Sequence, residues 1–225
     1  MAEGKLSGRA TEALTIIVSI LLALGADAAW DIQRDRADEA ELLAGITSEF
    51  DAAVQELRVD SLARDAMHRR YQLALAHRRG DVASPDSLVA IFGSLLDWRF
   101  HTPGHAVLDD ALTSGRFQLI RSDSVRTAIM RYQRQRERLD VFEVAEREIV
   151  ENQLEPYLAS HLALDRLLRP ADPAEVARFG ALLRDDDTFG SLLMLKRQRT
   201  RMARTFAGMA ASRAEDVVRA LTTEG

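Results

Sequence analysis

The sequence predicts an all-α protein in which one N-terminal transmembrane helix continues into an antiparallel helical bundle. The 225 residues are 47% hydrophobic and 29% charged, with only 5 prolines and 12 glycines, a composition typical of helical proteins. Apolar residues recur every three or four positions over long stretches, and no stretch alternates with period two. An uncharged apolar stretch lies close to the N-terminus. We therefore expect a tail at 1–11, a membrane helix at 12–30 and a bundle at 31–225.

The expected membrane helix rests on the stretch ALTIIVSILLALGADAAW, residues 13–30. As a helix it is roughly 27 Å long, close to a hydrocarbon core of about 30 Å. Its leucine, isoleucine and valine residues each favour insertion by roughly 0.3–0.6 kcal/mol. Asp27 and Trp30 are expected at the membrane interface, where a carboxylate reaches the headgroups and tryptophan is enriched.

A cleaved signal peptide is the alternative interpretation of this stretch. Lys5 and Arg9 precede the apolar run, and Ala26-Asp27-Ala28 has the form of a cleavage site. Against cleavage, helix formers continue through WDIQRDRADEAELLAGITSEF without a turn. We expect an uncleaved anchor in a bacterial inner membrane. The basic residues before the span favour a cytoplasmic N-terminus and a periplasmic C-terminal domain.

Small residues form one face of the expected span. Thr15, Ser19 and Ala23 follow one another at intervals of four, a pattern that lets a second membrane helix approach closely. In an alanine-rich chain the same row also arises by chance. The packing interpretation predicts the lipid bilayer and other membrane-protein subunits as partners.

The first helix is expected to continue from about residue 11 to 79, because Gly80 and Pro85 then interrupt the pattern. Short helices are expected over 86–99 and 106–113, separated by a turn at Pro103-Gly104.

A long helix follows, with Ser122 as its N-cap, and Pro156 kinks or ends it. Asp172 is expected to cap a further helix that has Pro173 at its first position. The aspartates of RDDDTFG are expected to cap the last helix. Large apolar residues mark the expected buried stripe of this last helix: Leu192, Leu195, Met202, Phe206, Met209, Val217 and Leu221.

The sequence predicts no catalytic residues, no cofactor, no metal and no enzymatic activity. There is no cysteine, which excludes disulfides and thiolate metal sites, and no motif of a hydrolase, metalloprotease or nucleotide-binding loop is present. His101 and His105, with Asp109 and Asp110 nearby, allow a metal site as a minor alternative. A polar loop is the favoured interpretation.

Two basic runs, RYQRQRER and KRQRTRMAR, are candidates for contact with other molecules. A net charge of -5 argues against nucleic acid as the partner. A solvated face with ion pairs is the first interpretation of these runs, and contact with a partner or anionic lipid is the second. The candidate contact residues are Arg131, Arg134, Arg138, Lys196, Arg197 and Arg201.

Two stretches resemble an uncharacterised bacterial family of N-terminally anchored, single-pass membrane proteins. They are ALTIIVSILLALGADAAWDIQRDRADEAELLAGITSEFDAAVQELR and LDDALTSGRFQLIRSDSVRTAIMRYQ. The resemblance implies the topology described above and implies no activity.

The function expected from these features is that of a non-catalytic accessory subunit that docks on and stabilises a larger membrane complex. Photosynthetic reaction-centre or antenna complexes and respiratory complexes both accept such subunits. The alternative is a membrane-anchored sensor or ligand-binding helical domain.

Overall fold

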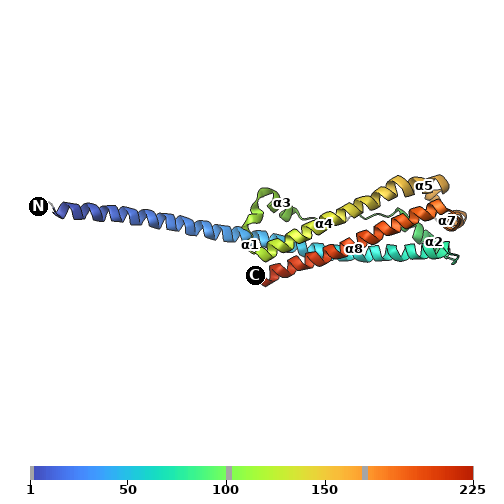
Figure 1. Cartoon of the computed structure of the whole chain (residues 1–225), viewed down its shortest axis with the longest axis horizontal. Coiled ribbons are helices and arrows are strands. Elements are labelled where there is room, and N and C mark those ends of the chain that lie inside the picture. Colours follow the sequence, from blue (N-terminus) through green and yellow to red (C-terminus); the bar gives the residue numbers. More distant parts are fainter. Residues whose placement is uncertain (1–2, 100–102, 169–171, 225) are drawn as a thin grey trace. The chain divides into compact units, whose positions relative to one another are not determined.

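The computed structural model describes residues 3–99, 103–168 and 172–224, with side chains except at 3–18, 20, 21, 23, 167, 168 and 224. Every regular element in these ranges is helical, which confirms the all-α class (Figure 1). The elements are α1 (Glu3–Arg78), α2 (Pro85–Leu96), α3 (Ala106–Ser114), η1 (Arg116–Leu119), α4 (Asp123–Ile149), η2 (Val150–Leu154), α5 (Glu155–His161), α6 (Leu164–Leu168), α7 (Pro173–Asp185) and α8 (Asp187–Glu224).

The chain divides into two compact units. The smaller one combines the chain up to Ile46 with Ala106–Arg121, and the larger one combines Thr47–His105 with the chain from Ser122 onwards. Each unit has its own core and is described separately below.

The larger unit is built on three long helices: α1 from Thr47 onwards, α4 and α8, which lie side by side in Figure 1. Ion pairs fix their directions. Along α1, Arg58 and Asp65 pair with Glu215 and Arg204 of α8, so α1 runs antiparallel to α8.

Helix α4 also runs antiparallel to α8, because Gln135 bonds the carbonyl of Phe206 and Glu146 pairs with Lys196. Helices α1 and α4 are therefore parallel to one another, whereas the sequence predicted an antiparallel bundle of long helices with short connections. The cause lies in the connection. The chain returns along α1 through α2 and the segment after it, as the bonds from Tyr71 to Ser94 and from Arg64 to Arg99 show.

An apolar core fills the larger unit around α2, α5 and α7. The rings of Phe92 and Phe179 meet edge to face at 5.4 Å, and Phe179 meets Phe189 at 6.0 Å. These rings pack with buried aliphatic residues of α1, α4 and η2: Met67, Ala74, Ile149, Val150 and Leu154. Burial of such side chains is the main source of stability in a helical unit.

The buried stripe of α8 differs from the expected one. Small residues form it between α8 and α4: Ala203, Ala207, Ala210 and Ala214. Of the large apolar residues expected inside, only Val217 is buried, and Met209 is 52% exposed. Helix α4 is the most extensive neighbour of α8, and alanines at the contact allow the two helices to approach closely.

Local capping explains where most helices begin and end. Gly80 adopts a left-handed φ of 109° and ends α1 in a Schellman motif, in which Asp81 N–H bonds the Ala76 carbonyl at 3.1 Å. The predicted caps Ser122 and Asp172 accept bonds from Val125 and Ala174.

The third predicted cap is also confirmed: among the aspartates of RDDDTFG, Asp186 accepts the Phe189 N–H at 2.7 Å at the start of α8. That bond lowers the pKa of Asp186 below its usual value.

Pro156 does not end the helix that contains it. The chain passes from α4 through a π-helical turn, η2, into α5. Proline has no N–H for the carbonyl four residues earlier, and its ring would collide with that carbonyl. Widening the preceding turn by one residue removes the collision, so the helical rod continues to His161.

The smaller unit has a modest core of Leu42, Ile46, Leu108, Ala111 and Ile120. Gly45 allows the close approach of α3, because a Cβ at this position would lie 3.0 Å from Val107 Cγ1. Gly115, with φ 82°, ends α3 and begins η1, which gives the Ser-Gly-Arg step of the sequence a structural role.

Among the residues that the structure describes, no helix combines the length and apolar character needed to cross a bilayer. Half of the predicted span at 13–30 consists of residues whose side chains lie outside that description.

Candidate functional site

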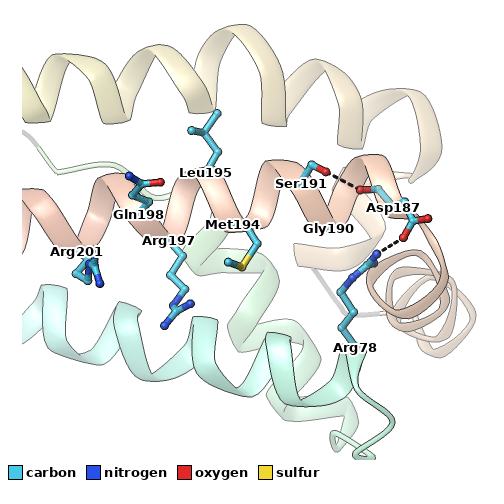
Figure 2. Close-up of a pocket in the computed structure, with 9 residues that line it drawn as sticks. All are labelled: Arg78, Asp187, Gly190, Ser191, Met194, Leu195, Arg197, Gln198 and Arg201. Carbon is cyan, nitrogen blue, oxygen red and sulfur yellow. Dashed lines mark hydrogen bonds and ion pairs between the residues drawn. The ribbon is translucent and has the colours of Figure 1, made fainter.

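A basic groove lies on the larger unit between α8 and the end of α1. Its volume is about 810 Å³, within the range of small-molecule sites. Three arginines line it, Arg78, Arg197 and Arg201, together with one carboxylate, Asp187. Figure 2 shows Met194, Arg197 and Arg201 projecting from α8 towards α1.

Arg78 lines the groove, but its guanidinium group is already hydrogen-bonded to other residues of the protein. It donates to the carbonyls of Leu183 and Asp186 at 3.2 and 2.7 Å, and to the Asp187 carboxylate at 2.5 Å. These hydrogen bonds satisfy carbonyl groups at the C-terminal end of α7. Gly190 makes room for the arginine, because a Cβ there would lie 2.4 Å from the Arg78 guanidinium carbon.

Arg197 and Arg201 differ from Arg78 because their guanidinium groups have no carboxylate or carbonyl partner among the described residues. The Nε of Arg197 is buried without a hydrogen-bond partner there. Their charge acts on the neighbouring His68 of α1. Burial, followed by the cations of Arg204 and Arg197, lowers the pKa of His68 below its usual value.

A buried ionic network lies in the interior of the same unit. It contains three carboxylates and three cations: Asp60, Glu143, Glu146, Arg64, Arg99 and Lys196. Arg64 contacts all three carboxylates at 2.5–3.1 Å and has no exposed surface. Burial alone would lower the pKa of Arg64, but the carboxylates outweigh it and raise that pKa above its usual value.

Lys196 lies in this network and not on the surface, which corrects its predicted role as a partner or lipid contact. Its side chain is 0% exposed and donates to Glu146 and to the Asp97 carbonyl, both at 2.8 Å. Burial lowers the pKa of Lys196, although Glu146 opposes the shift. The Thr200 hydroxyl donates to the same Glu146 oxygen.

The other five predicted contact residues separate into two places. Arg131, Arg134 and Arg138 are exposed on α4. Arg197 and Arg201 lie together in the groove. Sequence reasoning missed Arg78 and His68 because both belong to α1, and no local pattern indicates which α8 residues they face.

The histidine region does not form a metal site in the described residues. His105 is buried, with Nε2 2.7 Å from the Tyr132 hydroxyl and its ring 5.0 Å from that of Phe50. His101 lies outside the described residues. Within the described ranges no group of three metal-ligating side chains occurs. His105 is therefore a core residue at one end of the larger unit.

The structure describes only some of the side chains that were predicted to lie in or next to the membrane. The side chains of Thr15 and Ala23 lie outside the description, and Ser19 is exposed. Asp27 and Trp30 are exposed as well, Trp30 by 71%. From Leu24 to Ala37 every side chain of α1 is exposed.

Comparisons of this chain with protein-family models, with curated proteins and with solved structures gave no match. The described structure alone therefore defines the class: an all-α protein with a helical bundle, a buried ionic network and a basic groove.

Proposed function

We propose that this chain is a non-catalytic, single-span membrane protein whose helical bundle docks on a larger bacterial membrane complex. The observation that carries the proposal is the exposure of α1 around its whole circumference from Leu24 to Ala37. Leu24, Trp30 and Ile32 are 60%, 71% and 50% exposed there. These three large apolar side chains are exposed on a stretch that also carries five charged residues. Exposed large apolar side chains favour contact with a partner or a membrane interface.

The sequence at residues 13–30 supplies the second support, because its apolar length approaches the thickness of a hydrocarbon core. In this proposal Trp30 and Asp27 lie at the interface. The N-terminus is cytoplasmic, and the bundle lies on the periplasmic side.

Alkaline extraction of membranes tests the anchor. We expect the full chain to remain in the membrane pellet and residues 31–225 to be soluble with unchanged helical circular dichroism per residue. Intact mass of the extracted full chain checks cleavage. A full chain released by alkaline washing, or a product that begins at Ala29, would show that residues 13–30 are not an anchor.

Co-purification in mild detergent tests the docking. We expect Ser19→Leu combined with Ala23→Leu to release the chain from its complex while it stays in the membrane. Leu22→Ile combined with Leu24→Ile is the control, because it preserves apolar character and leaves the small-residue face intact. If both double variants co-purify equally well with the complex, the small-residue face does not contribute to docking and the span acts only as a membrane anchor.

A further inference from the structure

We propose that the basic groove binds a ligand that carries a phosphate monoester or similar dianion, held by Arg197 and Arg201. This inference goes beyond the docking role and does not depend on the membrane anchor, because all groove residues belong to the larger unit. It assigns a ligand class to a site that the sequence interpretation left as a general contact surface.

The charge balance of the groove is the first argument. The Asp187 carboxylate is already paired with Arg78, so two guanidinium charges remain without an anion among the described residues. Elsewhere on α8, Arg204 pairs with Asp65 and Arg213 with Asp216, both at 2.8 Å. Two cations held close together in a concave surface repel one another, and a bound dianion removes that repulsion.

The spacing of the two arginines is the second argument. They are four residues apart on α8, so they lie on one face of the helix with their Cβ atoms roughly 6 Å apart. A carboxylate has two oxygens, which a single guanidinium fork satisfies. A phosphate monoester has three terminal oxygens and a charge of about -1.5 to -2 near neutral pH, which matches two forks.

The remaining lining suits an organic phosphate. The Gln198 amide supplies further polar groups, and Met194 is 48% exposed beside the arginines. A flexible thioether side chain adapts to apolar groups of different shape. The ligand class is therefore a phosphate monoester, from either a soluble metabolite or a lipid headgroup such as phosphatidic acid.

The pKa of His68 indicates whether the basic groove is occupied. Burial lowers the pKa of His68, the cations of Arg204, Arg197 and Arg201 lower it further, and Asp65 opposes them. A dianion bound to two of these arginines screens that effect, so the pKa of His68 rises when the groove is filled.

The test uses the full chain in a neutral detergent, with ionic strength matched by sodium chloride. Inorganic phosphate is added in one arm and phosphatidic acid in mixed micelles in the other. Calorimetry measures affinity, and the pH titration of the His68 ring signals by NMR reports the site. We expect binding in at least one arm together with a higher His68 pKa.

Two double variants distinguish binding in the groove from a general effect of the protein's positive charge. Arg197→Gln with Arg201→Gln should weaken binding at least tenfold. Arg134→Gln with Arg138→Gln should leave binding within twofold, because it removes the same charge, also four residues apart, from the exposed surface of α4. Thermal melting by circular dichroism establishes that both variants fold.

The outcomes are distinct. Binding of inorganic phosphate indicates a soluble ligand, whereas binding of phosphatidic acid alone indicates a headgroup. Both results support the phosphate site if the His68 pKa rises and only the groove variant is impaired. No binding in either arm, binding without a rise in the His68 pKa, or equal weakening by both variants would overturn the proposal.

Discussion

Arg64 carries a full positive charge inside the bundle, where the carboxylates around it provide the compensation that water would give. Removing this guanidinium leaves like charges facing one another in a low-dielectric interior. Breaking a buried ion pair from one side is therefore much more costly than breaking a surface pair.

We predict that Arg64→Met lowers the free energy of unfolding by roughly 3–5 kcal/mol, measured by urea denaturation in detergent. Arg58→Met is the matched control. Arg58 is 56% exposed and forms one ion pair with Glu215 at 2.8 Å, so its loss should change the free energy by less than about 1 kcal/mol. Similar losses in the two variants would contradict the network as a source of stability.

His68 makes the stability of the protein depend on pH. Its folded pKa lies below its usual value because of burial and the nearby Arg204, Arg197 and Arg201, with Asp65 opposing. Below about pH 6.5 the unfolded chain binds a proton here more readily than the folded chain. The free energy of unfolding contributed by His68 therefore falls as the pH decreases.

We predict that His68→Gln reduces the loss of stability between pH 7 and pH 5.5. The measurement is the difference in free energy of unfolding between the two pH values, compared with that of the wild type. An identical difference in variant and wild type would show that His68 does not titrate differently in the two states.

At the scale of single residues, the sequence predicted charge but not location. Lys196 and Arg201 lie in the same basic run, KRQRTRMAR, yet one is buried and the other is exposed. What separates them is the rotation of α8. The alanine stripe that contacts α4 determines this rotation, whereas the larger apolar residues predicted a different face. Partners such as Glu143, 79 residues from Arg64, leave no local pattern.

At the scale of the helices, termini follow local chemistry. Gly80, with a φ of 109°, follows the end of α1. Gly93 instead lies within α2, where an added Cβ would meet no atom within 4 Å. The same substitution should therefore have opposite effects at the two positions.

We predict that Gly80→Ala lowers the free energy of unfolding by roughly 1–2 kcal/mol, since a Cβ is strained at positive φ. Gly93→Ala should raise it by roughly 0.5–1 kcal/mol, since alanine is the better helix former. Urea denaturation of both variants measures the difference. The same sign in both would contradict the assigned backbone conformations.

The helix starts were predictable for the same local reason. Ser122, Asp172 and Asp186 accept the N–H bonds that their sequence positions indicate. The continuation beyond Pro156 was not predictable, because a proline usually ends a helix and the compensating π-helical turn depends on the surrounding core. The direction of α4 relative to α1 also depends on tertiary structure, through the long return segment.

At the scale of the whole molecule, the two units differ in how much apolar surface each buries. The smaller unit has five buried hydrophobic residues in its core, Leu42, Ile46, Leu108, Ala111 and Ile120, whereas the larger unit has an extensive core cluster. Units with small cores open more often than units with large ones.

We predict that amides of Ala106–Ser114 exchange with deuterium faster than those in the middle of α4 and α8. Hydrogen exchange followed by mass spectrometry of the full chain in detergent measures this. The middle of α4 and of α8 serves as the internal reference in the same sample. Equal protection in the two units would indicate that they unfold as one.

The buried ionic network also determines the axial register of the long helices. A seam of alanines is smooth, and on its own it lets α8 slide along α4 by a turn, about 5.4 Å, with little change in contact. Lys196 and Thr200 lie on one face of α8, and both donate to the Glu146 carboxylate. Such a slip would break at least one of these two hydrogen bonds. The unpaired charges would remain in the interior. A single set of ion pairs at one height therefore selects one alignment from several that apolar packing alone would accept.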